Sequence, residues 1–277
     1  MQTDVAGAGT GTGTGVRTIA LVSPLGGTGQ STVVANLACI LAQRGVPCLA
    51  LDLCAQNALG LHLGRTKPVK QGWAHLVDTG QWWGDAALEN SARVRWLPFG
   101  IADVALLERL YERLRNQDNW LQQQLAALSL EPDSLVLLDV PTWPSPLAQQ
   151  ALRCADLVLV VLEASWRAQQ IHPEVQSLLQ QVRASAVHGV LLTRFDPRRA
   201  TQQTALHALQ TQWHGHVLPH VVHEDESVPS AMAATDCVAH HMPQAQAAHD
   251  LQGVASWLQD HMHITSSAPG APGKKNA

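Results

Sequence analysis

A glycine-rich turn with hydroxyl side chains follows the first strongly apolar segment of the chain. The segment Arg17–Ser23 reads as a strand, and the turn 24–29 leads into a helical pattern that starts near Ser31. Main-chain N–H groups of such a turn, together with the positive end of the helix, can hold an anion such as phosphate. Ser31 is placed to offer its hydroxyl to Mg²⁺, and Thr32 to contact a phosphate oxygen. We therefore predict a nucleotide-binding loop formed by Leu25, Gly26, Gly27, Thr28, Gly29, Gln30, Ser31 and Thr32.

This loop lacks the positive charge that phosphate-binding loops usually carry. The usual pattern has Gly at position 24 and Lys at position 30, where this chain has Pro24 and Gln30, and the first lysine is Lys67. A neutral amide in place of an ammonium weakens a hydrogen bond to phosphate by roughly 1–1.5 kcal/mol. Removal of a preorganised charge costs more in catalysis, about 2.7–4 kcal/mol of transition-state stabilisation. Binding is therefore expected to outlast hydrolysis. The alternative is an ordinary glycine turn without a ligand.

Acidic residues end two other apolar segments. Asp52 closes the segment PCLALD, and Asp139 closes the segment SLVLLD. Ligands of open parallel sheets bind at the carboxyl ends of the strands, so we expect both carboxylates to hold Mg²⁺ with Ser31, partly through water. An acid at a strand end can instead cap the next turn. Thr193 also ends an apolar segment and is expected at the same edge of the sheet.

Short apolar runs alternate with helical patterns along the chain, and no internal repeat is present. Runs that are apolar on both faces are typical of parallel strands covered by helices, and the alternation implies a doubly wound sheet. We predict an α/β fold of three layers, with a mostly parallel sheet and helices on both faces, in one P-loop domain over residues 16–263. The expected strands are Arg17–Ser23, Pro47–Asp52, Val94–Pro98, Ser134–Asp139, Leu157–Leu162 and Val187–Thr193, and the expected helices are Ser31–Arg44, Asp103–Leu128, Ala168–Arg183, Thr201–Trp213 and Gln244–His261. Residues 1–15 and 264–277, rich in Gly and small residues, are expected to be disordered tails.

Composition argues against several classes of protein. The formal net charge of −4 and the pI near 6.4 give no general attraction to nucleic acid or to anionic membranes. The five cysteines are scattered without a C-x-x-C pair, which favours reduced thiols. We find no signal-peptide pattern and no apolar run long enough to cross a membrane. The expectation is a cytoplasmic protein, recruited to the inner membrane or cell pole only through partners.

Several polar and aromatic groups leave alternatives open. The run 223–226, HEDE, is either a partner-binding acidic loop or a solvated turn before a helix. The arginines at 194, 198 and 199 could follow DNA phosphates, but a solvated loop is the favoured interpretation in an acidic chain. The fourteen histidines show no structural zinc spacing, which favours surface positions. The Trp-rich stretch 73–83 either packs in the core or docks another protein.

The glycine-rich loop, LGGTGQST, resembles the deviant Walker A motif of the ParA/MinD/Soj family, K-G-G-x-G-K-[ST]-T. Leu25 and Gln30 stand where that family has its two lysines. The run Asn36-Leu37-Ala38, the strand ending at Asp52 and the run Asp139-Val140-Pro141 follow the family's order. The resemblance extends from Arg17 to about His261. It implies a P-loop ATPase fold of the SIMIBI class, ATP and Mg²⁺ as cofactors, and a homodimer that sandwiches nucleotide. It also implies that Thr193, which stands after a strand where the family often has an adenine-contacting Asn, contacts the nucleotide base.

Finer motifs resemble the BcsQ branch of that family, the ParA-like proteins of bacterial cellulose-synthesis operons. These motifs are Gln71-Gly72-Trp73, Gly80-Gln81-Trp82, Leu97-Pro98-Phe99-Gly100 and His223-Glu224-Asp225-Glu226. The branch also lacks the P-loop lysine, and it has Cys where the wider family has a second switch aspartate, as at Cys54 here. The resemblance implies an accessory protein with weak or absent hydrolysis that regulates or localises the membrane synthase complex. Its partners would be that complex and small cytoplasmic subunits. The alternatives are an active ATPase that positions plasmid, chromosome or other cargo, and a structural module that binds no nucleotide.

Overall fold

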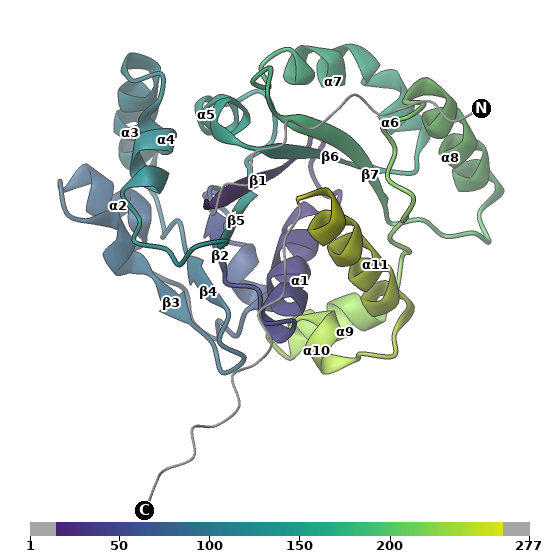
Figure 1. Cartoon of the computed structure of the whole chain (residues 1–277), viewed down its shortest axis with the longest axis horizontal. Helices are drawn as coiled ribbons and strands as arrows, with labels where there is room; N and C mark the ends of the chain where they lie inside the picture. The colour runs from purple at the N-terminus through teal and green to yellow at the C-terminus, as the bar shows by residue number, and fades with distance from the viewer. Residues whose placement is uncertain (1–14, 263–277) are drawn as a thin grey trace, which may run out of the picture.

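The computed structural model describes residues 15–262, whose strands all join one sheet (Figure 1). The seven strands lie in the order β3-β4-β2-β5-β1-β6-β7, and every neighbouring pair is parallel except β3 with β4. Valine and leucine cover both faces of the central strands, so these strands must be covered on both sides. The strands are β1 (Arg17–Val22), β2 (Cys48–Asp52), β3 (Leu88–Glu89), β4 (Arg95–Leu97), β5 (Leu135–Asp139), β6 (Leu157–Glu163) and β7 (Val187–Thr193).

Helices cover the two faces of the sheet and complete the three expected layers. On one face α1 and α11 lie side by side, with α9 and α10 beside them (Figure 1). The other face packs against α2 to α8, and each face has its own hydrophobic core. The α-helices are α1 (Gln30–Gln43), α2 (Trp73–Asp78), α3 (Val104–Asn116), α4 (Trp120–Ala126), α5 (Pro146–Cys154), α6 (Trp166–Gln170), α7 (His172–Leu179), α8 (Ala200–Gln212), α9 (Ser227–Ala233), α10 (Val238–His241) and α11 (Gln246–His261), and two 3₁₀ helices span Leu59–His62 and Trp83–Ala86. The predicted α/β fold is confirmed.

Two of the expected long helices are each broken into two. The expected helix 103–128 ends at Asn116 and resumes at Trp120, because the buried amide of Gln150 donates to the carbonyls of Leu114 and Gln117 at 3.2 and 2.6 Å. The expected helix 168–183 breaks at Ile171, where Pro173 lies in the first turn of α7 and has no N–H to continue α6. The antiparallel strand β3 and the helices α2, α5 and α10 were not predicted. Helix α9 follows the run 223–226, where one of the two interpretations of the sequence placed a helix.

Both edges of the sheet are modified. At one edge, β3 contains only two residues and runs antiparallel to β4. At the other edge, the segment 216–224 runs along β7, with Leu218 N–H donating to Val190 O at 2.9 Å and Val222 N–H to Leu192 O at 2.9 Å. The N–H and C=O of Val190 and the C=O of Leu192, which face away from β6, therefore already have partners.

An aromatic cluster beyond β2 and β4 consists of Trp73, Trp83, Phe99 and Trp120, all buried. Its close packing depends on glycine, because a Cβ on Gly72 would lie 2.3 Å from Gly100 N and Phe99 C. Two motifs of the sequence analysis, 71–73 and 97–100, are thus packed against each other. The Trp-rich stretch is mainly core, although Trp82 keeps 44% of its surface exposed.

The expected tails, 1–15 and 264–277, lie outside the described residues except for Gly15, and the structure does not test them. Within 15–262, none of the helices combines the length and the apolar character needed to cross a membrane.

Candidate functional site

The glycine-rich loop joins β1 to α1 at the carboxyl edge of the sheet and leaves open space in front of it. Gly27 and Gly29 both have φ of +78°, the left-handed conformation that favours glycine. A Cβ built on Gly26, Gly27 or Gly29 would meet no atom within 4 Å. The first turn of α1 has neither a side-chain cap nor an acidic residue. Its free N–H groups and the positive end of the helix dipole therefore face a space that an anion can enter.

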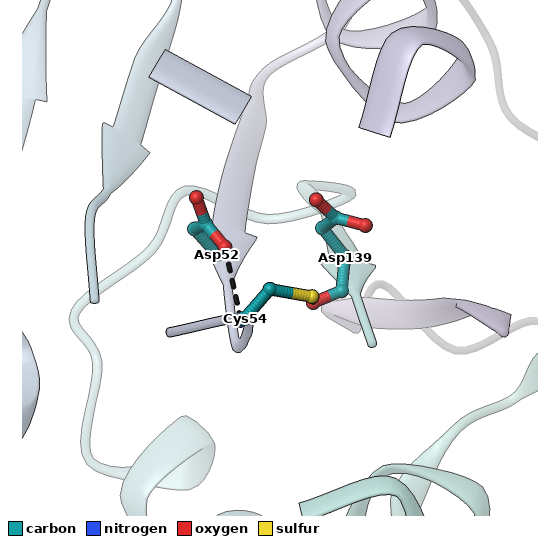
Figure 2. A group of neighbouring side chains, drawn as sticks. All are labelled: Asp52, Cys54 and Asp139. Carbon is teal, nitrogen blue, oxygen red and sulfur yellow. Dashed lines mark hydrogen bonds between the residues drawn. The ribbon is translucent and has the colours of Figure 1, made fainter. Parts of the chain in front are cut away.

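Two carboxyl groups and a thiol meet beside this loop (Figure 2). Asp52 and Asp139 are direct partners across β2 and β5, and their side chains with that of Cys54 place ligand atoms within 4.8 Å of one another. All three are buried. Cys54 N–H donates to Asp52 Oδ1 at 3.0 Å, whereas Oδ2 of each aspartate is buried without a hydrogen-bond partner. Orphaned carboxylate oxygens of this kind fit a hard divalent cation such as Mg²⁺.

Burial and mutual repulsion disfavour the charged forms of these groups. Burial raises the pKa of Asp139 from 3.8 to about 6, against hydrogen bonds from the Ser31 and Gln30 side chains. The pKa of Asp52 is raised by burial and then by the charge of Asp139. Burial, followed by the two carboxylates, also raises the pKa of the Cys54 thiol. Two like charges at this distance favour binding of a cation, which would relieve their repulsion.

Gln30 does not direct its amide N–H groups toward the open space in front of the loop. Its Nε2 donates to Asp139 Oδ1 at 2.7 Å and to Val140 O at 2.6 Å, which uses both amide hydrogens. These two hydrogen bonds tie the start of α1 to the end of β5. A hydrogen bond from Gln30 to a phosphate would require the amide to give up one of them.

A cavity of about 310 Å³ adjoins the glycine loop. The buried imidazole of His62 is in its wall, 3.2 Å from Thr32 Oγ1, and burial lowers the His62 pKa to about 4, so the ring is neutral. The sequence carries no signal for this histidine, because it lies outside every recognised motif, at the end of the 3₁₀ helix Leu59–His62. The cavity is lined mainly by apolar atoms and by residues from five separate segments: Gly27, Gly29, Thr32, Val33, His62, Thr193, Arg194, Val222, His223, Glu224, Asp225, Val228, Pro229, Met232 and Leu251.

Thr193, the residue that the sequence resemblance assigns to the base, lines this cavity, but its hydroxyl is already engaged. Thr193 Oγ1 donates to Thr28 O at 2.7 Å and lies 3.2 Å from Leu162 O. The hydroxyl therefore links the end of β7 to the glycine loop, and only its oxygen lone pairs remain available to a ligand.

The acidic run 223–226 forms part of the cavity wall. His223 Nδ1 lies 2.8 Å from the carboxylate of Asp250, and Asp225 accepts from the main-chain N–H groups of Ser227 and Ala247, both at 2.9 Å. Glu224 pairs with Arg194 at 2.8 Å. From the sequence, this run could be either a partner-binding loop or a solvated turn. Nothing in the sequence indicates that these side chains lie near the phosphate loop.

The remaining charged groups of the sequence analysis are paired with one another. Arg198 and Arg199 both contact the carboxylate of Asp196, at 2.8 and 3.2 Å. Across residues 15–262, the one grouping of three or more His, Cys, Asp or Glu side chains suited to a metal ion is Asp52, Cys54 and Asp139. The histidines therefore do not gather into a metal centre within the part of the chain that the structure describes.

The aromatic cluster is connected directly to the candidate metal site of Asp52, Cys54 and Asp139. Trp73 Nε1 donates to the carbonyl of Asp52 at 2.8 Å. Asn57, which follows Cys54, exchanges two hydrogen bonds of 2.8 Å with the main chain of Gly100. These hydrogen bonds hold the loop after β2 against the aromatic cluster and so restrict the position of Asp52.

The fold is similar to that of solved α/β proteins of the MinD type. MinD from Pyrococcus horikoshii, solved with Mg-ADP, superposes with a TM-score of 0.72 at 21% identity, over 90% of this chain and 98% of that one. Cobyrinic acid a,c-diamide synthase from Mycobacterium smegmatis, solved with an ATP analogue and magnesium, gives 0.75 at 20% identity, over 92% and 100%.

The sequence comparisons identify the family. The model of the family "Cellulose biosynthesis protein BcsQ" matches residues 16–258, and the chain belongs to this family. The cellulose biosynthesis protein BcsQ of Escherichia coli strain K12 is 29% identical over 243 residues, which are 84% of this chain and 90% of that protein. The chromosome-partitioning ATPase Soj of Thermus thermophilus is 28% identical over 256 residues, 87% of this chain and 94% of Soj.

Proposed function

We propose that this protein is an ATP-binding accessory protein of bacterial cellulose biosynthesis that regulates or localises the membrane synthase complex. The observation that carries the proposal is the open cradle at Gly26, Gly27 and Gly29, which lies at an uncapped helix N-terminus. Beside it, two carboxylate oxygens, of Asp52 and Asp139, are buried without partners. An anion with a divalent cation satisfies both features at once.

The residues present fit Mg²⁺. The Ser31 hydroxyl at the start of α1 would ligate the ion, and Asp52 and Asp139 would hold it directly or through water. The ion would neutralise charge on the nucleotide's phosphates. The chain's own part is to keep both carboxylates fixed at neighbouring strand ends. The hydrogen bond from Trp73 Nε1 to the main-chain carbonyl of Asp52 and that from Gln30 Nε2 to Asp139 Oδ1 contribute to this.

The nucleotide base would occupy the apolar cavity beside the loop. Val222, Val228 and Met232 offer apolar surface there, and the lining also includes Thr193. The solved MinD and cobyrinic acid a,c-diamide synthase structures contain Mg-ADP and an ATP analogue with magnesium, which supports the choice of an adenine nucleotide. Contacts from Leu25, Thr28 and Thr32 would complete the site.

Hydrolysis should be weak or absent, because the charged groups of an active site are missing. Leu25 and Gln30 replace the two lysines, and the amide of Gln30 faces Asp139. Loss of one preorganised charge costs catalysis about 10²–10³ in rate, and loss of a general base at Cys54 another factor of about 10²–10⁴. The binding energy falls far less, since the main-chain cradle is intact.

The proposed partners are a second copy of the chain and subunits of the cellulose synthase complex. Family membership supports the pathway. A solved MinC:MinD complex from Aquifex aeolicus shows that the same fold can bind a separate protein. Recruitment to the inner membrane or cell pole would then pass through those partners.

The test combines binding, turnover and a cellular readout. Isothermal titration of the full-length chain with ATP and Mg²⁺ should show binding, and an ATP turnover assay should show little or no hydrolysis. Deletion of the gene in its own bacterium should lower cellulose output, which wild type should restore and Gly29→Asp should not. Absence of nucleotide binding would leave only a structural module, and unchanged cellulose output would refute the pathway.

An active positioning ATPase is the second candidate, favoured by the 28% identity to Soj over most of the chain. Turnover at the rate of active relatives would select it, because another group would then supply the missing charge. A defect in plasmid or chromosome positioning on deletion, with normal cellulose, would select it independently.

A further inference from the structure

The glycine loop lies in a long stretch without basic residues. Between Arg17 and Arg44 the sequence contains no lysine or arginine, so neither the loop nor α1 before its carboxyl end carries a positive side chain. A triphosphate carries several negative charges, and a cradle of neutral amides alone holds it with hydrogen bonds of ordinary strength. Positive charge for the loop has to come from a segment distant in sequence.

Two arginines from the neighbouring strand ends lie against the loop. Arg167, at the start of α6 after β6, donates from Nη2 to Gly26 O at 3.1 Å. Arg194, directly after β7, donates from Nη1 to Gly27 O at 2.9 Å. Two guanidinium groups thus bind consecutive carbonyls of the loop, from segments more than a hundred residues away.

The geometry of the peptide unit carries this charge toward the ligand side. In a trans peptide the C=O and N–H groups point in opposite directions. A guanidinium on Gly26 O therefore lies behind the N–H of Gly27, and one on Gly27 O lies behind the N–H of Thr28. Hydrogen bonding at the oxygen polarises the peptide and strengthens donation by its N–H. The positive end of each dipole is reinforced where a phosphate would bind.

The two arginines differ in how freely their charge acts. Arg167 has only a loose carboxylate neighbour, Glu163, at 3.9 Å from Nε. Arg194 is paired with Glu224 at 2.8 Å and lies in the wall of the cavity. Its backbone has φ of +54°, which is uncommon for a residue with a side chain.

We infer that Arg167 and Arg194 supply positive charge from behind the glycine loop, in place of the two missing lysines. This charge makes the site prefer a nucleoside triphosphate over the nucleoside alone. The inference rests on the proposed function and adds the residues that give the site its phosphate affinity. Arg167 contributes more, because no carboxylate within hydrogen-bonding distance neutralises it.

The test is isothermal titration of the full-length protein with ATP·Mg²⁺ and with adenosine, for wild type, Arg167→Gln, Arg194→Gln and the double variant. Glutamine keeps a hydrogen-bond donor but loses the charge. Both side chains are about half exposed, 57% and 49%, so water screens them. We expect ATP affinity to fall about fivefold to tenfold for Arg167→Gln, about threefold for Arg194→Gln, and about 30-fold for the double variant. Adenosine affinity should change by less than about twofold.

Further variants separate charge from bracing of the loop. Arg167→Lys should retain most of the ATP affinity, because it restores the charge. The salt dependence of ATP binding should weaken in the double variant, since exposed charges are screened by salt. Arg198→Gln is the matched control: Arg198 follows the same strand, is 87% exposed and pairs with Asp196 without touching the loop. It should bind ATP as wild type does.

Each outcome bears on one of the two proposals. Wild-type binding that is unchanged in the double variant would overturn this inference and leave the proposed function standing. Equal losses for ATP and adenosine, or a loss that Arg167→Lys does not rescue, would also overturn it in favour of simple bracing. A wild type that binds neither ligand would overturn the proposed function, and this inference with it.

Discussion

The glycine loop and the aromatic cluster both follow strand ends at the same edge of the sheet, but glycine serves opposite purposes in them. In the loop, a Cβ on Gly26, Gly27 or Gly29 would meet nothing within 4 Å. In the cluster, a Cβ on Gly72 would collide with main-chain atoms at 2.3 Å. One region keeps space open for a ligand, and the other uses the absence of a side chain to pack two loops together.

A glycine motif does not reveal its use by sequence alone. Both motifs, 26–29 and 71–73, carried the family resemblance. The surroundings decide whether a glycine opens a ligand site or allows close packing. The glycine loop has free N–H groups, whereas Gly72 is next to the fully buried Trp73. Substitutions that fill each space should therefore have different consequences, in stability for one region and in binding for the other.

The largest expected effect is on the stability of the aromatic cluster around Gly72. Gly72→Ala places a methyl group against the backbone of Phe99 and Gly100, which cannot move aside as a flexible side chain could. We expect the free energy of unfolding to fall by about 3 kcal/mol or more. Gly26→Ala, with open space and no positive φ, should change it by less than about 0.5 kcal/mol. Urea unfolding of both variants measures the contrast, and equal destabilisation would remove it.

The next largest effect is expected on ligand binding by the glycine loop. Gly29→Asp puts a carboxylate into the anion cradle, and ATP affinity should fall by more than about 100-fold through repulsion and lost amide contacts. Gly215→Asp is the matched control, because Gly215 also has a positive φ, +81°, and open space around it. Both variants bear the same backbone strain, so only binding to Gly29→Asp should be lost. Titration with ATP and Mg²⁺ measures this, and undiminished binding would show that the loop is not the site.

A smaller effect should appear with pH at the paired carboxylates. The Asp139 pKa is raised from 3.8 to about 6, so its stabilising contribution without metal is present below about pH 4 and is lost as pH rises through about 6. Mg²⁺ binding requires the ionised form, so apparent Mg²⁺ affinity should rise about tenfold between about pH 5 and about pH 7. Thermal unfolding with and without Mg²⁺ follows both trends. Asp139→Asn should flatten the pH dependence of both the stability and the apparent Mg²⁺ affinity. If both dependences were unchanged in that variant, a group other than Asp139 would be responsible for the titration.

The smallest effect tests the link between the loop and β5. Gln30→Lys places an ammonium beside Asp139, so part of the new charge is neutralised by that carboxylate instead of acting on phosphate. We expect ATP affinity to rise severalfold, to at most about tenfold, with a measurable gain in hydrolysis. A coupled ATP turnover assay checks the second part. No gain in hydrolysis would weaken the view that the missing lysine limits turnover.

The sequence was sufficient to predict the fold, because each central strand is a continuous apolar run and two of them end in aspartate. Neighbouring strand ends then bring Asp52 and Asp139 together. It could not predict the partners of Gln30 or the wall formed by His62 and Glu224, since these contacts join distant segments through particular side-chain directions. The break between α3 and α4 escaped prediction for the same reason: the amide that replaces the missing helix hydrogen bonds is on α5.

The two-residue strand β3 and the covered outer side of β7 have a consequence for assembly. An exposed strand with free amide groups invites another chain to extend the sheet, and short or covered edge strands prevent such growth into ribbons and fibrils. Here β3 offers only Leu88 and Glu89, and Val190 and Leu192 of β7 are already bonded to the segment 216–224. Extension of the sheet from one copy to another is therefore disfavoured at both borders, and any contact between copies is expected to use side-chain surfaces, which can be released again.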